Sequence, residues 1–354
     1  MTFAGIAYTG AADHAKRALP IVDTEMKDRL PEINRQLRDG LTARPPANFD
    51  VNASQLAELA GSSSAIVMAV ALDRETATVE RIGDKYKVLF ELAGQVLFFD
   101  FRERQVLFSY PVTLQHITAL PTSPTPTEKA AIANQIVFGS GPSDLTAVVA
   151  DTVANLALPG SSSRRIQLVD VRLAPAVGGK VSQAMADSAL IGHEFSKILA
   201  STLRLPMLPH AQGQAIGGAM AARFADGTAY TLRIPEPDYR MVLDVVDFRQ
   251  KTLSETPAVR RQLYGAFFNL RVEEPLSSTV YFDQPLRQGS TIDIPSTQED
   301  VDTDAAYYET LIAGFSSMSQ AINGGAAPWA GEQTGGRDFT KQLKSLKELI
   351  AKCR

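Results

Sequence analysis

Lys85 to Val112, KYKVLFELAGQVLFFDFRERQVLFSYPV, carries the strongest strand pattern in this chain and indicates its fold class. It reads as a long strand, a charged turn over Asp100–Arg104 and a second strand that returns to a Tyr-Pro pair. Apolar residues occupy both parities around Val88–Leu92 and Val96–Phe101, so the first strand is expected inside a sheet with both faces covered. Pro111 has no N–H to donate, so it either ends the second strand or places that strand at a sheet edge.

The segments on either side of this hairpin predict a mixed sheet packed by helices. Apolar residues from Val22 to Leu41 are spaced three and four apart, as on one helix face, and Pro31 predicts a kink or two abutting helices. The unbroken apolar run Ala65–Leu72 is typical of a strand covered on both faces. The remaining expected elements of this half are a strand over Phe3–Tyr8, a Pro/Thr loop over Thr118–Thr127, and helices over Glu128–Phe138 and Leu145–Leu156.

The bulk properties bound the number of domains and the class of function. A chain of 354 residues fits two domains of roughly 150 residues and a tail. With 45% apolar and 21% charged residues, both domains can bury a core. The net charge of −4 argues against a general nucleic-acid binder, and no run of apolar residues is long enough for a transmembrane span.

The second half of the chain repeats the order of the first. Its expected elements are a strand over Ile166–Leu173, a helix over Phe195–Leu203, a small-residue helix over Ala211–Ala225, a strand over Tyr239–Phe248, a hairpin over Tyr264–Val272 and Thr279–Leu286, and a closing helix over Tyr308–Ile322. A shift of 174 positions lays Val106, Phe108, Pro111 and Val112 on Val280, Phe282, Pro285 and Leu286. We therefore expect an internal duplication.

These patterns predict an α/β (α+β) protein of two tandem similar domains. Each domain is expected to hold a mixed sheet with a long hairpin packed by helices. The predicted boundaries are 1–158 for the first repeat, 166–323 for the second, 324–337 for a Gly/Ala-rich linker and 338–354 for a basic amphipathic C-terminal helix.

Three segments resemble a group of bacterial envelope domains. They are FAGIAYTG at 3–10, LAELAGSSSAIVMAVAL at 56–72 and LFELAGQVLFFDFRERQVLFSYPV at 89–112. This order is similar to the amino-terminal domain of TolB, the curli-secretion lipoprotein family and the lipoprotein activators of peptidoglycan synthases. The chain departs from these in having no lipid-attachment Cys near its N-terminus and in the length of its Pro/Thr loop. The resemblance implies a non-catalytic periplasmic module that docks onto other envelope proteins.

The residues that usually carry chemistry form no recognisable constellation. The four histidines include no pair at i, i+4, and the sequence HEFSK at His193 lacks the second His of a zincin. The glycine-rich pieces match neither a P-loop nor a dinucleotide-binding fingerprint, and the acidic run Gln298–Asp304 lacks the glycine of an EF-hand. We therefore expect no catalytic residues, no cofactor and no metal site.

Protein contact is the function that the sequence favours. Partners would be envelope proteins or a second copy of the chain, reached through exposed sheet edges. The C-terminal helix carries an apolar stripe between lysines, which fits a helix packed on the body of the protein, a partner-docking helix or a membrane-surface helix. The candidate contact residues are Tyr110, Pro111, Pro124, Pro126, Phe339, Leu343, Leu346 and Ile350.

A carrier or sensor of an apolar small molecule or lipid is the alternative. Its ligand would lie between the two domains, beside the small-residue segment, where pockets commonly form. The candidate cleft residues are Ile216, Gly217, Gly218, Met220 and Phe224. The strand that begins close to Met1 favours a periplasmic protein whose signal peptide has been removed, with a cytoplasmic protein as the alternative. The single Cys353 is expected as an exposed tail thiol or as an intermolecular disulfide.

Overall fold

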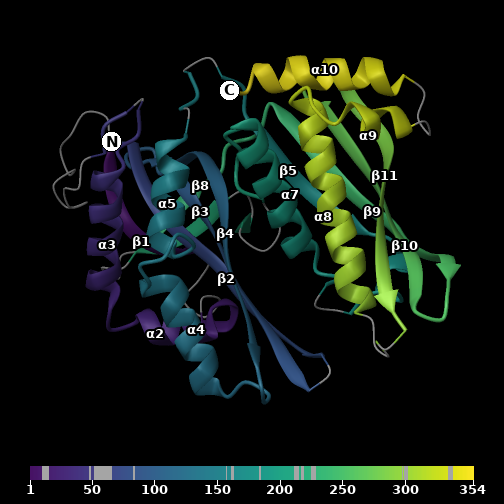
Figure 1. The fold of residues 1–354 in the computed structure, drawn as a ribbon. Helices are drawn as coiled ribbons and strands as arrows, with labels where there is room; N and C mark the ends of the chain where they lie inside the picture. The colour runs from purple at the N-terminus through teal and green to yellow at the C-terminus, as the bar shows by residue number, and fades with distance from the viewer. Residues whose placement is uncertain are drawn as a thin grey trace. The chain divides into compact units, whose positions relative to one another are not determined.

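The computed structural model places most of the chain in two compact units (Figure 1). The first unit comprises Met1–Leu158 and Gly213–Pro235, and the second comprises Pro159–Gln212 and Glu236–Arg354. The structure describes all residues except 10–15, 48, 52–65, 83, 157, 161–162, 183–184, 211–214, 217–218, 225–228, 297, 299–301 and 334–337.

The first unit is a seven-stranded mixed sheet with helices on one face. Its strand order is β1-β2-β3-β4-β8-β7-β6, and a further pairing of β1 with β7 closes the sheet on itself. The elements are β1 (Thr2–Thr9), α2 (Pro20–Met26), α3 (Leu30–Ala43), β2 (Ile66–Ile82), β3 (Lys85–Asp100), β4 (Gln105–Leu120), α4 (Pro126–Phe138), α5 (Leu145–Ala154), β6 (Ala215–Ile216), β7 (Ala219–Phe224) and β8 (Ala229–Arg233).

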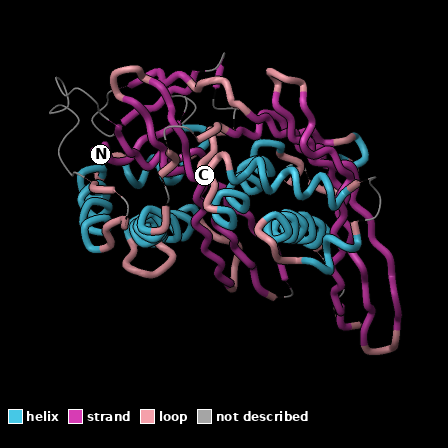
Figure 2. The backbone as a smooth tube through the Cα atoms, turned by 90° about the horizontal axis from the view of Figure 1, so that it is seen from above, coloured by secondary structure: helices cyan, strands magenta, loops and turns pink. Residues whose placement is uncertain are grey.

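The second unit is a four-stranded sheet in the order β11-β10-β9-β5. Helices α7 and α8 pack on β5, β10 and β11, and the helices (cyan) lie on one side of the strands (magenta) in Figure 2. The elements are β5 (Ile166–Leu173), α6 (Pro175–Gly178), α7 (Ser188–Leu203), β9 (Tyr239–Glu255), β10 (Val259–Glu274), β11 (Thr279–Pro295), α8 (Thr303–Ile322), α9 (Ala327–Glu332) and α10 (Phe339–Ala351).

The predicted fold class is confirmed, and the hairpin lies where the sequence placed it. Strand β3 runs between β2 and β4, and its residues from Phe90 to Phe99 are buried. Strand β4 passes through Pro111 and ends at Leu120, so the interpretation of this proline as a strand stop is wrong. The strand is not an edge of the sheet either, because it lies between β3 and β8, although its described pairing with β8 is at Gln105 and does not reach Pro111. Pro31 lies in the first turn of α3, which confirms two abutting helices.

Three predicted segments differ from the structure. The loop over Thr118–Thr127 is shorter than expected, because β4 continues to Leu120 and α4 begins at Pro126 behind a capping box of Thr125 and Glu128. The predicted helix over Ala211–Ala225 is wrong, since strands β6 and β7 lie there. The Gly/Ala-rich linker holds the short helix α9.

The two units share the geometry of their four central strands. In both, the first strand runs parallel to the second and the next two are antiparallel. Each sheet has an extra residue at matching places: Asp73 of β2 and Val246 of β9, then Leu107 of β4 and Tyr281 of β11. Arg104 and Ser278, 174 positions apart, both have positive φ in the turn before the last strand (48° and 55°). Bulges are specific local features of a strand pair. Their occurrence at matching places in both sheets is therefore a closer similarity than the shared strand order alone.

Candidate functional site

The most exposed regular structure in the second unit is the far end of its sheet, which we call the arm, residues 249–261 and 287–295. Strand β5 pairs with β9 only as far as Val245, so the arm is a ribbon of β9, β10 and β11 (Figure 1). Every residue from Arg249 to Val259 is exposed. Arg261 of β10 forms a bidentate ion pair with Asp293 of β11, with Nε–Oδ1 and Nη2–Oδ2 distances of 2.7 and 2.8 Å. The arm is thus held by backbone pairing, by this ion pair and by the burial of Ile294, which is 3% exposed.

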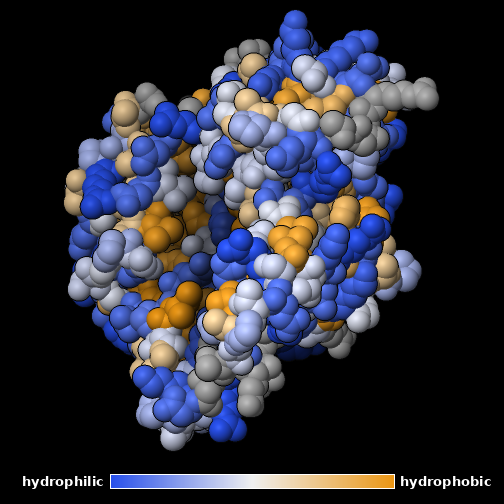
Figure 3. Space-filling view, turned by 45° about the vertical axis from the view of Figure 1, so that its right-hand side comes forward, coloured by the Kyte–Doolittle hydropathy of each residue, from blue (hydrophilic) through white to orange (hydrophobic). Residues whose placement is uncertain are grey.

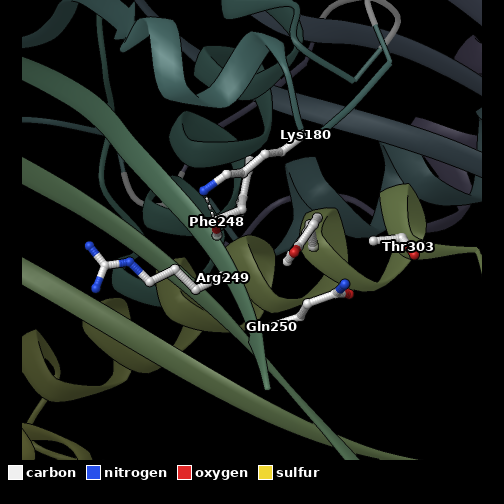
Figure 4. Close-up of a pocket in the computed structure, with 6 residues that line it drawn as sticks. Lys180, Phe248, Arg249, Gln250 and Thr303 are labelled. Atoms are coloured by element: carbon white, nitrogen blue, oxygen red, sulfur yellow. Dashed lines mark hydrogen bonds between the residues drawn. The ribbon is translucent and has the colours of Figure 1, made fainter. Parts of the chain in front are cut away.

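An open pocket of about 510 Å³ lies at the root of the arm (Figure 4). Strand β9 supplies one wall, the start of α8 supplies another, and the segment after α6 supplies a lysine (Figure 4). The lining residues are Lys180, Phe248, Arg249, Gln250, Thr303 and Tyr307.

The charged groups of this pocket are already paired. Lys180 donates from Nζ to Oδ1 of Asp247 at 2.5 Å and to the carbonyl oxygen of Phe248 at 2.7 Å. Arg249 donates from Nε to the other carboxylate oxygen of Asp247 at 2.8 Å. These hydrogen bonds from Lys180 and Arg249 lower the pKa of Asp247. Both cations therefore share one carboxylate, which leaves little charge to hold a free anion.

An aromatic group forms the inner wall of the pocket. The ring of Tyr307 stacks on Phe248 with centroids 5.0 Å apart and meets Tyr264 edge-on at 5.5 Å. Burial raises the pKa of Tyr307, so its hydroxyl stays protonated at neutral pH. The pocket offers an aromatic surface beside hydrogen-bonding groups, which suits a side chain of a bound segment.

The outer edge of β11 is sealed along half of its length. The backbone N–H of Asp283 donates to Oε1 of Gln342 at 2.8 Å, and Pro285 has no N–H. Gln333, which is 4% exposed, accepts from the N–H of Arg287 at 2.9 Å and donates to its carbonyl oxygen at 3.1 Å. This amide takes both backbone groups of one residue, as a neighbouring strand would.

The candidate contact residues of the C-terminal helix lie inside the second unit. Helix α10 packs on β11 and α8, and Phe339 meets Phe282 with ring centroids 6.0 Å apart. The apolar stripe is therefore covered by the chain's own sheet. The exposed fractions are 8% for Phe339, 8% for Leu343, 1% for Leu346 and 2% for Ile350.

The candidate contact residues of the first unit divide between core and surface. Tyr110 is buried beside Phe98 and Phe108, and this burial raises its pKa. Pro111 is half-buried in β4. Pro124 is half-buried and Pro126 is exposed at the start of α4, so of this set Pro126 is the residue open to a partner.

Three of the five candidate cleft residues lie in strands β6 and β7 of the first unit. Ile216 ends β6, while Met220 and Phe224 lie in β7, and their side chains are outside the described residues, as are Gly217 and Gly218. The pairing of Ile216 with Ala219 flanks the two glycines. A Gly-Gly pair between two strands is a hairpin signal, which the helix interpretation of this segment missed.

Cys353 is buried, so the expectation of an exposed tail thiol is wrong. Its thiol is 0% exposed and lies near the carbonyl oxygen of Leu349, with an Sγ–O distance of 3.6 Å. Burial raises its pKa to about 12, which keeps the thiol protonated and unreactive at neutral pH. The end of the chain is held by Arg164, whose N–H donates to the carbonyl oxygen of Lys352.

His210 is a half-buried histidine whose ring lies against β5 and α7. Its Nδ1 lies 2.7 Å from the carbonyl oxygen of Leu168, and a Cβ at position 192 would lie 2.5 Å from its Nε2, so only Gly192 leaves room for the ring. Desolvation lowers the pKa of His210 against the opposing effects of the Leu168 carbonyl and Asp170. The neutral ring is therefore the form that the fold holds.

Replacing His210 with Asn is expected to remove part of the acid sensitivity of the second unit. A pKa depressed by folding gives stability that is present above the unfolded value of about 6.5 and is lost as the pH falls toward the folded value. Through His210, the free energy of unfolding of the wild-type protein should fall by up to about 1.4 kcal/mol for each pH unit lost in this window. Urea unfolding between pH 7.5 and 5.0 measures the slope, and equal slopes in wild type and His210→Asn would contradict the assignment.

Two further properties of the described residues bear on function. No group of three or more His, Cys, Asp or Glu side chains in the described part of the chain could hold a metal ion. Among the same residues, no helix is long and apolar enough to cross a membrane.

The comparisons with known proteins return structural likenesses alone. No family model matches the chain, and no curated protein matches its sequence. A neuraminyllactose-binding hemagglutinin homolog from Helicobacter pylori is similar at 11% identity and a TM-score of 0.27, over 55% of this chain and 94% of that one. A minor lipoprotein from Acinetobacter baumannii is similar at 10% identity and a TM-score of 0.22, over 45% of this chain and 87% of that one. The PelC dodecamer from Paraburkholderia phytofirmans is similar at 14% identity and a TM-score of 0.19, over 45% of this chain and 91% of that one. Likenesses with TM-scores this low do not identify the function of this chain.

Proposed function

We propose that this protein is a non-catalytic assembly protein of the bacterial envelope that acts in the periplasm through protein–protein contacts, within an outer-membrane-associated complex. The arm carries this proposal. Ordering a ribbon costs conformational entropy, and a ribbon exposed from Arg249 to Val259 recovers little of that cost by burial. A partner that covers the arm would supply the missing burial. Leu253 and Val259, 48% and 37% exposed, are its apolar contacts.

The surface chemistry supports contact through backbone edges. On the face drawn in Figure 3, hydrophilic residues surround separate apolar patches. In the second unit, one face of the sheet carries ion pairs such as Arg271 with Asp283 and Arg172 with Asp170. Such a solvated face gives little apolar area to bury, so strand edges and the pocket at the arm's root are the better contact points.

We propose that the chain arose by tandem duplication of repeats near 1–158 and 166–323, of which the segment Gly213–Pro235 of the second repeat lies in the first unit. The matching bulges and the turn residues with positive φ support this origin. After a duplication, the strand edges of one copy can stay paired with further strands while those of the other copy become unpaired. The first sheet is completed by β7 beside β1, whereas in the described residues of the second unit no further strand pairs with β9 beyond Val245 or with the outer edge of β11.

The envelope location rests on the resemblance of segments 3–10, 56–72 and 89–112 to envelope domains. Cell fractionation of the native host tests it, with recovery in the periplasmic or outer-membrane fraction as the expected result. The carrier alternative gains no support from the described residues, because the side chains of its candidate cleft are outside them.

Shortening the arm is expected to abolish partner binding while the fold survives. Residues 253–261 are replaced with Asn-Gly, which joins the paired residues Thr252 and Gln262 through a two-residue turn. The free energy of unfolding should change by no more than about 1 kcal/mol, because the removed residues are largely exposed. Native mass spectrometry of the protein from envelope extract should show complexes above 38.2 kDa for wild type and a monomer for the variant.

The matched control shortens the corresponding hairpin of the first unit. Residues 80–87 are replaced with Asn-Gly, which joins the paired residues Val79 and Val88 and keeps the buried Val88. This control should keep the complexes. A wild-type protein that stays a monomer in the extract at every dilution would end the assembly proposal.

A further inference from the structure

We propose that the outer edge of β11 between Gly289 and Pro295 binds an extended acidic segment of a partner protein, which joins the sheet as an added strand. This inference rests on the proposed function and names both the contact edge and the chemistry of the partner.

The geometry of β11 turns a row of backbone groups outward. Strand β11 is the last strand of its sheet, and its register with β10 is unbroken from Phe282 to Pro295. The N–H groups of Asp283 and Arg287 point away from β10, because side-chain amides accept from them. Backbone direction alternates with period two, so the N–H and C=O groups of Gly289, Thr291 and Asp293 point outward as well.

The protection of this edge stops where the arm begins. Gln342, Pro285 and Gln333 close the outward positions from Asp283 to Arg287, and Nε1 of Trp329 adds a bond to the carbonyl oxygen of Arg287 at 3.2 Å. From Gly289 to Pro295, the outward backbone groups of β11 receive one hydrogen bond from the described part of the chain. The side-chain amide of Gln288 donates it to the carbonyl oxygen of Gly289. Proteins usually protect exposed strand edges, so a seal that covers only half of an edge marks the other half as a place for a partner strand.

The charge of the arm selects an acidic partner. Basic residues of the arm outnumber acidic ones by five to two in a chain whose net charge is −4. Arg261 is paired with Asp293 and Arg249 with Asp247, whereas Lys251 and Arg260 carry no ion pair in the described residues. Two arms of this charge would repel each other, which disfavours edge pairing with a second copy. The basic residues are Arg249, Lys251, Arg260, Arg261 and Arg287, and the acidic ones are Glu255 and Asp293.

One face of the arm would meet the acidic side chains. By the register, Arg287, Thr291 and Asp293 lie on the same face as Arg249 and Arg261. An added strand with acidic residues at alternate positions would place these residues directly opposite the small residues of β11. The same acidic residues would lie diagonal to Arg287, within the reach of long side chains.

The test uses defined peptides and a backbone-blocking variant. The probes are fluorescent-labelled, end-blocked octapeptides of alternating Thr and Glu, with alternating Thr and Lys as the comparison. The full-length protein should bind the acidic peptide at least tenfold more tightly than the basic one. Thr291→Pro removes an outward N–H and should weaken the acidic peptide at least tenfold, whereas Thr291→Ala should stay within twofold of wild type. Pro285 already holds the same register in this strand, which shows that a proline fits there.

Hydrogen exchange locates the contact and separates the alternatives. Bound acidic peptide should slow exchange at Gly289, Thr291 and Asp293, and unchanged exchange at these amides would overturn the proposal. Equal binding of both peptides, or full binding by Thr291→Pro, would also overturn it. Slower exchange with rising protein concentration and no peptide would assign the edge to a second copy instead. If wild type forms envelope complexes that Thr291→Pro retains, this inference fails and the proposed function stands.

Discussion

Replacing Phe315 with Ala is expected to lower the free energy of unfolding of the second unit by about 4 kcal/mol. Phe315 lies on α8 and is 0% exposed. Its ring meets Phe195 of α7 edge-on at 5.0 Å and Phe268 of β10 edge-on at 5.3 Å. It therefore joins both helices to the sheet, and its removal leaves a cavity as well as lost burial.

The cavity left by Phe315→Ala cannot close easily, so little of the expected loss of about 4 kcal/mol is recovered by relaxation of the core. Gly314 lies so close to Phe268 that a Cβ there would be 2.8 Å from the ring, so the helix already touches the sheet at that point. Neighbouring side chains in a close-packed core relax only in part into an empty space.

The single tryptophan makes this measurement specific to one unit. Trp329 lies in α9 of the second unit, so its fluorescence during urea unfolding follows that unit. The matched control is Phe267→Ala on the half-buried opposite face of the same sheet, where the loss should be below about 1.5 kcal/mol. Equal losses for the two variants would mean that Phe315 is not the junction described above.

The sequence predicted the parts of the sheet that bury apolar side chains and missed the parts that do not. The expected strands over Tyr239–Phe248 and Thr279–Leu286 stop where the arm begins, and β9 and β11 continue to Glu255 and Pro295. The segment RQKTLSETPAVRRQ, residues 249–262, shows no apolar alternation, because most of it is exposed on both faces. Periodicity reports burial on one face, so it cannot detect such a ribbon. The arm was thus absent from the predicted site.

The long-range pairing of the β6–β8 segment was equally hidden. Strand β7 pairs with β1 although the two are far apart in the sequence, and the local pattern of residues in either strand carries no trace of such a partner. Small residues such as the alanines of β7 fit helices and strands alike, so propensity did not decide between the two. The capping box at Thr125 was missed as well: Thr-Pro-Thr-Glu carries its pattern, but the helix was expected to begin at Glu128 and not at Pro126.

Replacing Leu346 with Asp is expected to unfold the second unit, and it separates two roles for the C-terminal helix. Leu346 is 1% exposed on the face of α10 that packs on β11 and α8. A carboxylate there would be buried without a partner, at a cost of at least about 4 kcal/mol. That is a large share of the roughly 5–15 kcal/mol that typically stabilises a domain. The Trp329 signal and hydrogen exchange across β11 report the loss.

The matched control is Lys344→Asp on the exposed side of the same helix, which should change stability by less than about 1 kcal/mol. If α10 is a structural lid on β11, Leu346→Asp destabilises the isolated protein and frees the edge that Gln342 and Gln333 seal. If its apolar stripe is instead a partner-docking face, Leu346→Asp leaves the isolated protein as stable as Lys344→Asp and removes only the partner. The burial of the stripe leads us to expect the first result.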